Sequence, residues 1–273
     1  MIDSQARKRR VTMTSNWFRE FWVFRELFYF LVWRDVKVRY KQTLLGVAWA
    51  VIQPFFSMII FTLFFGRLAG MPSDGIPYPI FTYAALVPWT YFSTSLSFSG
   101  NSLVSNSNLV KKVYFPRAAL PAAAALAGLI DFAIASGVLV ILMIYYKIGL
   151  SWELLMWPVL VLPLAVLVLG VGMILSALNV KYRDVKYAIP FGIQIWMFLT
   201  PIIYPTSIVP ERYRFLAHLN PLTGMIEAFR AALLPDRTIH WLPVGTSCLS
   251  VLVILFVGAV YFQRSEREFS DVI

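Results

Sequence analysis

The 273-residue chain has few of the side chains that enzymes use for acid–base chemistry or metal binding. Only 14% of its residues are charged, two are histidine, and Cys248 is the single cysteine. One cysteine excludes an intrachain disulfide, and its place in an apolar run favours a structural thiol over a reactive one. His218 and His240 have no cysteine or carboxylate at ligand spacing, which argues against a metal site.

Sequence motifs for nucleotide or hydrolytic chemistry are missing too. The chain has no Gly-x-x-x-x-Gly-Lys-Ser/Thr phosphate loop, so it does not cradle ATP by that route. It also has no His-x-x-Glu-His motif and no convincing pair of nucleophile and base. We therefore expect a protein that is not an enzyme and binds no cofactor or metal of its own.

Apolar residues are what the chain has in abundance. They make up 59% of it, with a mean hydropathy of +0.70, which leaves too little polar surface for a water-soluble globule. A hydrocarbon core of about 30 Å takes about 20 helical residues to cross. Runs of that order predict an all-α integral membrane protein with six transmembrane helices: Leu44–Gly66, Ile80–Val104, Ala118–Tyr146, Leu154–Leu178, Ala188–Tyr204 and Leu242–Phe262.

The basic residues gather on one side of this predicted topology. An even number of spans places both chain ends on the same side, together with the loops after spans two and four. These segments contain 18 of the 24 Lys and Arg residues. Positive charge marks the cytoplasmic side, so we expect both termini there. The net charge of +10 then reflects orientation and contact with anionic membrane lipids, and we expect no nucleic-acid partner.

The segments outside the spans divide the chain further. Residues 1–15 form a basic cytoplasmic tail, residues 43–262 the six-span domain, and residues 263–273 a cytoplasmic C-terminal tail. Residues 16–42 predict an amphipathic helix in the membrane interface, although a seventh, poor span is the alternative. The charged residues on one side of this helix are Arg19, Glu26, Arg34, Lys37 and Lys41. The apolar residues on its other side are Trp17, Phe21, Phe28 and Leu31.

Three connecting segments show local structure. Residues 106–117 predict an Asn-capped helical turn that ends at Pro116, either a docking helix or merely a capped turn. Residues 179–187 form a second basic element, which is also the ordinary flank of two spans. On the outer side, the apolar run that begins at Pro221 has 14 residues, too few to span, and predicts a short re-entrant helix with a surface helix as the alternative.

A few polar residues lie inside predicted helices. Asp131 lies in the middle third of span three, where a lone charge costs at least about 2.5 kcal/mol. We expect it to make a structural or gating hydrogen bond to a neighbouring helix, with protonation or contact with water as alternatives. Glu227 and Arg230 are three residues apart and can pair on one helical face, in a structural or gating role.

Aromatic and polar side chains also share faces within two of the spans. Trp49, Gln53 and Phe56 share a face of span one, while Trp196 and Thr200 share a face of span five. Aromatic rings with polar neighbours suit the faces of sugars as well as they suit helix packing. The pattern alone leaves both interpretations open.

Five short phrases, in this order, resemble the ABC-2 type permeases that export polysaccharides, notably the O-antigen exporters. The resemblance covers about residues 25–262. The phrases are Arg34-Asp35-Val36-Lys37-Val38-Arg39-Tyr40-Lys41-Gln42 with the following Leu45-Gly46, Trp49 and Gln53-Pro54; Val113-Tyr114-Phe115-Pro116-Arg117; Asn179-Val180-Lys181-Tyr182-Arg183-Asp184-Val185; Pro201-Ile202-Ile203-Tyr204-Pro205; and Asn220-Pro221.

The resemblance implies a half-transporter. Two copies would form a channel for lipid-linked polysaccharide across the bacterial inner membrane, driven by two copies of a separate ATPase that binds ATP and Mg. The short helices between spans five and six would guard the exit. The residues implied in coupling to the ATPase are Arg34, Lys37, Leu109, Lys111, Tyr114, Phe115, Arg117, Tyr182, Arg183 and Asp184. The residues implied in the channel are Trp49, Gln53, Phe56, Trp196, Thr200 and Tyr204.

Two alternatives to O-antigen export stay open at this point. Export of capsule or teichoic acid by the same machinery differs only in cargo, which these residues do not distinguish. A membrane-embedded transferase acting on polyprenyl-linked sugars belongs to another class of protein. Such an enzyme needs catalytic groups that converge at one membrane face, whereas carboxylates in the inner loops are scarce apart from Asp184.

Overall fold

A computed structural model describes residues 22–41, 45–149, 152–233, 239–266 and 269. Its regular secondary structure over these ranges is entirely helical. Among the described residues, four segments are long and apolar enough to cross a membrane: Ala48–Leu68, Ala119–Tyr145, Trp152–Lys181 and Trp241–Ser265. The prediction of an all-α membrane protein is therefore confirmed.

These segments correspond to predicted spans one, three, four and six. The first consists of α4 (Ala48–Phe61) and the π-helix η2 (Thr62–Leu68), and the second is α7 (Ala119–Tyr145). The other two are the short 3-10 helix η3 (Trp152–Met156) with α8 (Trp157–Lys181), and α12 (Trp241–Ser265).

Predicted spans two and five correspond to α5 (Tyr78–Ser105) and α9 (Val185–Leu199). The 28 residues of α5 are long enough to cross, but many Ser and Thr side chains lower its hydropathy. The 15 residues of α9 extend about 22 Å, less than the hydrocarbon thickness. Span five was predicted to run to Tyr204, but the helix ends at Leu199 because Thr200 precedes Pro201 and takes an extended conformation. The count of six spans stays a prediction.

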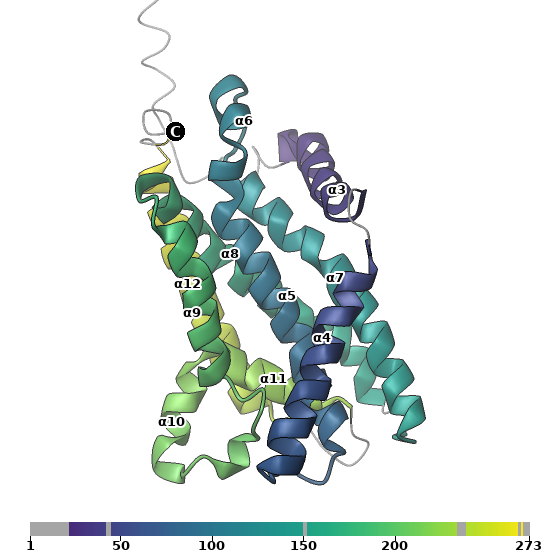
Figure 1. Ribbon diagram of the computed structural model, residues 1–273. Coiled ribbons are helices and arrows are strands. Elements are labelled where there is room, and N and C mark those ends of the chain that lie inside the picture. Colours follow the sequence, from purple (N-terminus) through teal and green to yellow (C-terminus); the bar gives the residue numbers. More distant parts are fainter. Residues whose placement is uncertain (1–21, 42–44, 150–151, 234–238, 267–268, 270–273) are drawn as a thin grey trace, which may run out of the picture.

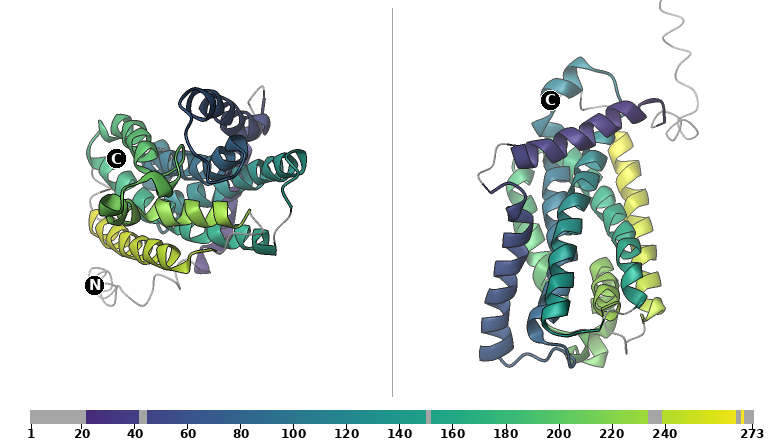
Figure 2. Two further views of the ribbon diagram at one scale, coloured as in Figure 1. Left: turned by 90° about the horizontal axis from the view of Figure 1, so that it is seen from below. Right: turned by 90° about the vertical axis from the view of Figure 1, so that its right-hand side faces the viewer.

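The helices form a bundle with α5 at its centre, in contact with α4, α7, α8, α9 and α11. At one end lie α3 (Arg25–Lys41) and α6 (Ser107–Lys112), which we call the α3 end. Toward the other lie α10 (Glu211–Leu219) and α11 (Pro221–Ala231), which we call the α10 end. Figure 1 and the right panel of Figure 2 show α3 lying across its end of the bundle. An interface helix would lie in this way, whereas a seventh span would run along the other helices.

The predicted helix 16–42 is longer than α3. Its residues 16–21 and Gln42 lie outside the described residues, as does the whole predicted tail 1–15. Of the apolar residues predicted for one side, Leu31 is buried and packs against α7, while Phe28 is only partly buried. The C-terminal tail is described at residues 263–266 and 269.

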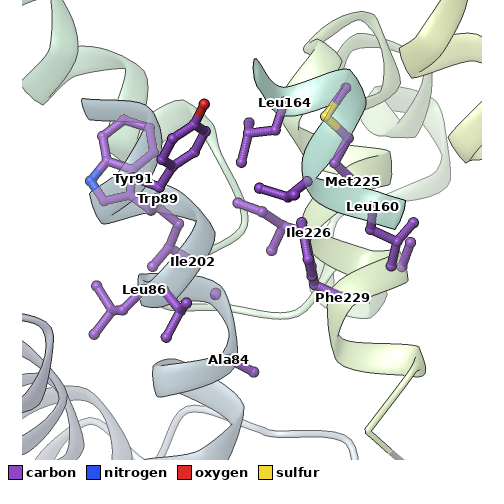
Figure 3. Close-up of a cluster of buried hydrophobic side chains, with 14 of the residues drawn as sticks. Ala84, Leu86, Trp89, Tyr91, Leu160, Leu164, Ile202, Met225, Ile226 and Phe229 are labelled. Carbon is purple, nitrogen blue, oxygen red and sulfur yellow. The ribbon is translucent and has the colours of Figure 1, made fainter. Parts of the chain in front are cut away.

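The main hydrophobic core lies where α5, α8 and α11 meet (Figure 3). Aromatic rings join these helices: the ring of Phe229 on α11 lies 4.6 Å from that of Trp157 on α8, edge to face. Phe132 of α7 stacks on Trp157 at 6.2 Å. Edge-to-face and stacked ring pairs of this kind stabilise the packing of helices. Packing matters in a membrane because the hydrophobic effect does not drive helices together within lipid.

Glycines bring α8 and α12 into backbone contact. A Cβ atom added to Gly258 would lie 2.3 Å from the carbonyl oxygen of Gly170. A Cβ on Gly170 would in turn lie 2.9 Å from the Cα of Leu255. Small residues of this kind are how membrane helices approach closely, and no larger side chain fits at either position without moving a helix.

A second hydrophobic cluster lies at the α3 end. It includes Leu31 of α3, Val110 of α6, Phe115 of the following loop, and Phe262 and Phe269 at the end of the chain. The rings of Phe262 and Phe269 meet edge to face at 5.4 Å. This α3-end cluster joins the interface helix, the loop after α5 and the C-terminal segment into one unit.

Candidate functional site

The loop after α5 begins with a short helix, α6, in agreement with the one or two helical turns predicted for residues 106–117. That this helix docks a partner stays a prediction. Asn106 occupies the N-cap position of α6, but its side chain makes no capping bond. Its Nδ2 instead donates to the carbonyl oxygen of Ser102, one turn back, at 2.8 Å. The predicted Asn cap is therefore right in position and wrong in its hydrogen bond, because donation by Nδ2 to Ser102 turns the side chain back along α5.

The most exposed part of this loop follows α6. The Tyr114 side chain is 83% exposed, and Lys111, Lys112 and Val113 are exposed beside it. The adjacent Phe115 is only 3% exposed and lies in the α3-end cluster. Tyr114 is thus available to a partner, whereas Phe115 holds the loop to its own chain. Leu109 lies half-buried between these extremes.

Arg117 connects the same loop to the end of α12. Its Nη1 donates to the carbonyl oxygen of Glu266 at 2.8 Å, and its guanidinium lies 5.8 Å from the ring centroid of Phe269. The Arg117 backbone N–H also donates to Glu266 Oε1 at 3.4 Å. Among the described contacts, Arg117 therefore serves the internal structure of the α3 end.

The other residues implied in coupling also lie at the α3 end. Tyr182, Arg183 and Asp184 are exposed between α8 and α9. On α3, Lys37 is exposed with its ammonium 5.6 Å from the Trp33 ring, and Arg34 donates to the Asp35 carboxylate at 2.7 Å. The structure gathers these residues at one end of the bundle, at separate points of its surface.

The residues implied in the channel fall into two groups on either side of α5. On α4, Trp49 and Phe56 are more than half exposed, and Gln53 between them is exposed as well. On α9, Trp196 is half-buried against Phe92 of α5, with ring centroids 5.0 Å apart. The α4 group therefore faces outward, whereas Trp196 takes part in packing within the chain.

A hydrogen-bond node surrounds Asn220, which the sequence indicated only as a helix start. Asn220 Oδ1 accepts from the Leu222 backbone N–H at 3.1 Å and from Trp196 Nε1 at 3.0 Å. Its Nδ2 donates to Thr200 Oγ1 at 2.9 Å. The side chain thus caps α11 and ties it to the end of α9. Tyr204 lies nearby and donates from its hydroxyl to the Phe198 carbonyl oxygen at 3.3 Å.

Arg230 of α11 is buried, with 4% of the residue exposed. Its Nε donates to the Phe81 carbonyl oxygen at 3.1 Å, and its Nη2 donates to that of Ile202 at 2.7 Å. The guanidinium carbon also lies 3.6 Å from the Phe81 ring centroid. Arg230 therefore joins α11 to α5 and to the segment after α9.

Glu227 lies one turn before Arg230, and both line a cavity of about 360 Å³ at the α10 end. The Glu227 carboxylate accepts a hydrogen bond from Thr206 Oγ1. Almost all of α11 is enclosed by α5, α8 and α12 within the chain, and a helix lying on the membrane surface stays the alternative for it. Re-entry into a leaflet stays a prediction, as does the pairing of Glu227 with Arg230.

Asp131 of α7 meets two side chains of α3. Arg39 Nη1 donates to Asp131 Oδ2 at 2.6 Å, and the Tyr40 hydroxyl donates to Asp131 Oδ1. Burial, and then the hydrogen bond to Asp131, raise the pKa of the Tyr40 phenol well above its usual value, so the phenol stays protonated. A hydrogen bond from Asp131 to a neighbouring helix was predicted. Its partners were not, because Arg39 was counted only among the basic residues that mark the cytoplasmic side of the membrane.

Comparison with known proteins adds an independent observation. A family model described as ABC-2 type transporter matches residues 26–234. The chain is 29% identical to "O-antigen export system permease protein RfbA" of Myxococcus xanthus, over 93% of this chain and 98% of the relative. It is 27% identical to the protein of that name from Klebsiella pneumoniae, over 88% and 92%. It is 24% identical to "Polysialic acid transport protein KpsM" of Escherichia coli, over 86% and 91%.

Proposed function

This chain belongs to the ABC-2 type transporter family, and from that premise we propose that it is the permease subunit of an exporter of lipid-linked polysaccharide, with O-antigen as the cargo. The observation behind this proposal is the match to O-antigen export permeases along nearly the whole of both chains. Members of the family are transmembrane subunits of transporters and not enzymes, and ATP is hydrolysed in a separate subunit. The sugar-transferase alternative is set aside on that ground.

Capsular polysaccharide is the second candidate cargo. The polysialic acid transport protein matches this chain over most of its length, although at lower identity than the O-antigen permeases. A channel that contacts sugars through aromatic faces tolerates different repeats, because every pyranose offers an apolar C–H face. Accordingly, the two cargoes do not require different machinery in this chain.

The chain is a multi-pass membrane protein, and we place it in the bacterial inner membrane with both termini in the cytoplasm. The basic loops support this orientation: Lys111, Lys112 and Arg117 lie at the α3 end together with the basic residues of α3. The ATPase would then meet the α3 end, and the cargo would leave at the α10 end past α10 and α11.

Coupling to the ATPase is proposed to run through the exposed side chains of the α3 end. Tyr114 and Lys111 project from the loop after α5, and Arg183 projects from the loop after α8. The α3-end cluster lies directly beneath the first of these loops and connects it to α3, α7 and α8. A push on the loop would therefore reach the spans through packed side chains, which move as discrete bodies.

The channel is proposed to form between two copies of the chain. The outward group on α4, with Trp49 and Phe56, would line it beside the exposed face of α9, which includes Phe191 and Phe198. Among the described contacts, these faces have little protein over them within one chain. A second copy would cover them and leave a path lined by aromatic rings.

The proposal is tested by reconstitution. The purified permease and its partner nucleotide-binding protein are placed in proteoliposomes with a lipid-linked glycan. Glycan that crosses the membrane is then measured with and without ATP. We expect ATP-dependent transport that disappears when either protein is left out. ATP-independent sugar transfer by the permease alone, or no glycan movement with both active proteins present, would contradict the proposal.

A further inference from the structure

Arg39, Tyr40 and Asp131 form a contact between α3 and α7 that we call the clasp. We infer that the clasp is a positioning contact that makes α3 and α7 move as one body, so that displacement of α3 by the ATPase reaches the membrane-spanning helices. The inference rests on the proposed function. It gives a role to two residues of the basic α3 motif, Arg39 and Tyr40, that the coupling and channel sets leave without one.

The first argument is geometric. Arg39 Nη1 donates to Asp131 Oδ2 at 2.6 Å, and Arg39 Nη2 donates to the Ala124 carbonyl oxygen at 3.4 Å. The Tyr40 hydroxyl donates to the other Asp131 oxygen. Three hydrogen bonds from the last turn of α3 thus end on a single helix. Asp131 is engaged through both of its oxygens, which fixes its direction as well as its position.

A second attachment lies eight residues earlier on α3, at Leu31. Its side chain is 1% exposed and packs in the α3-end cluster, which includes Leu120 and Ala123 of α7. Eight helical residues span about 12 Å. Two attachments at that separation prevent α3 from pivoting on α7, which a single attachment would allow.

The surroundings of the clasp make it costly to open. The Arg39 and Asp131 side chains are 11% and 20% exposed, and the Arg39 guanidinium lies 4.3 Å from the Phe98 ring centroid on α5. In such a weakly solvated place a lone charge is strongly disfavoured, so the two charged groups stay together when either helix moves. Leu31 alone could slide, because dispersion contacts have no direction.

The first experiment removes the charge of Asp131. In proteoliposomes that contain the permease and its ATPase, we expect Asp131→Asn to lower the glycan transported per ATP hydrolysed by about fivefold or more, the lower range of a coupling free energy. ATP hydrolysis itself should continue. A ratio equal to wild type would overturn the inference.

A matched control is available on the same helix. Ser136 accepts a hydrogen bond from Trp157 Nε1 of α8 at 2.9 Å, so Ser136→Ala removes a polar contact of α7 that does not reach α3. We expect Ser136→Ala to keep the wild-type ratio of transport to hydrolysis. A fall as large as that of Asp131→Asn would show a general sensitivity of α7 and would overturn a specific role for the clasp.

The second experiment replaces the clasp by a covalent link. With Cys248→Ser as the background, Arg39→Cys and Asp131→Cys are combined, and a short bifunctional maleimide joins the two thiols. We expect the unlinked protein to transport little glycan per ATP and the linked protein to recover most of the wild-type ratio. Complete linkage without recovery would overturn the inference, whether or not Asp131→Asn folds.

These outcomes are distinct from a failure of the proposed function. If wild-type proteoliposomes transport no glycan, the function proposed for the chain is wrong. If wild type transports glycan and the clasp variants do so equally well, only the role of the clasp is wrong.

Discussion

The two ends of the bundle satisfy their buried polar groups in different ways. At the α10 end, Arg230 is held by the carbonyl oxygens of Phe81 and Ile202, which are part of the backbone and cannot move alone. At the α3 end, Arg39 is held by the carboxylate of Asp131, a side chain on another helix. The first arrangement ties a side chain to the backbone of neighbouring segments, whereas the second joins two helices through a pair of side chains.

The difference extends to the surfaces of the two ends. At the α10 end, α11 is almost entirely enclosed, and the Asn220 node ties it to α9. At the α3 end, Tyr114 and Lys111 project outward from a loop that Val110, Phe115 and Arg117 hold to the chain beneath it. We therefore expect substitutions at the α10 end to change stability first, and substitutions at the α3 surface to change transport first.

The largest expected effect is that of Arg230→Ala. Removing the guanidinium leaves two buried carbonyl oxygens without these donors, at a cost of about 1–3 kcal/mol each. We expect a markedly lower midpoint of thermal unfolding in detergent. The control is Arg214→Ala, because Arg214 is 45% exposed in its pair with Glu211 and its loss should change stability by no more than about 0.5 kcal/mol. Equal unfolding midpoints for the two variants would show that the buried contacts of Arg230 do not stabilise the α10 end.

Asn220→Ala should have a smaller effect at the same end. Loss of the N-cap costs about 1–2 kcal/mol, and Trp196 and Thr200 lose a partner as well. Thermal unfolding again measures the change. The matched control is Asn108→Ala, because Asn108 is exposed on α6. If Asn220→Ala unfolds at the wild-type temperature, the node does not hold α11 to α9.

Tyr114→Ala should have the smallest effect on stability, within about 0.5 kcal/mol, because the side chain is 83% exposed. ATP-driven transport should nevertheless fall several-fold if Tyr114 contacts the ATPase. Unchanged transport would remove Tyr114 from the coupling surface.

The adjacent Phe115→Ala is the informative counterpart to Tyr114→Ala. The Phe115 side chain is buried, and its loss should lower the free energy of unfolding by about 3 kcal/mol. A stable Phe115→Ala variant with reduced transport would mean that the α3-end cluster is not what holds this loop.

The sequence was sufficient for most of the helices. Long apolar runs predict helices because the bilayer demands internally satisfied backbones, and Asn220 with Pro221 correctly marked the start of α11. The end of span five was misplaced at Tyr204, although Thr200 before Pro201 held the signal for the break.

The sequence did not indicate the partners of the charged groups inside the bundle. Arg39 and Asp131 are 92 positions apart, and Arg230 reaches a carbonyl 149 positions away. Carbonyl oxygens are the same at every residue, so no pattern of side chains indicates which of them an arginine will meet. Such pairings arise only when the helices are packed.

The contact of Gly170 with Gly258 bears on how a passage can open. At this contact no side chain separates the backbones of α8 and α12, so the two helices cannot come closer together. A shift along their axes would drive the Leu255 backbone against Gly170. These two helices therefore form one rigid unit. We therefore expect any widening of a passage to take place at other helices of the subunit, away from this pair.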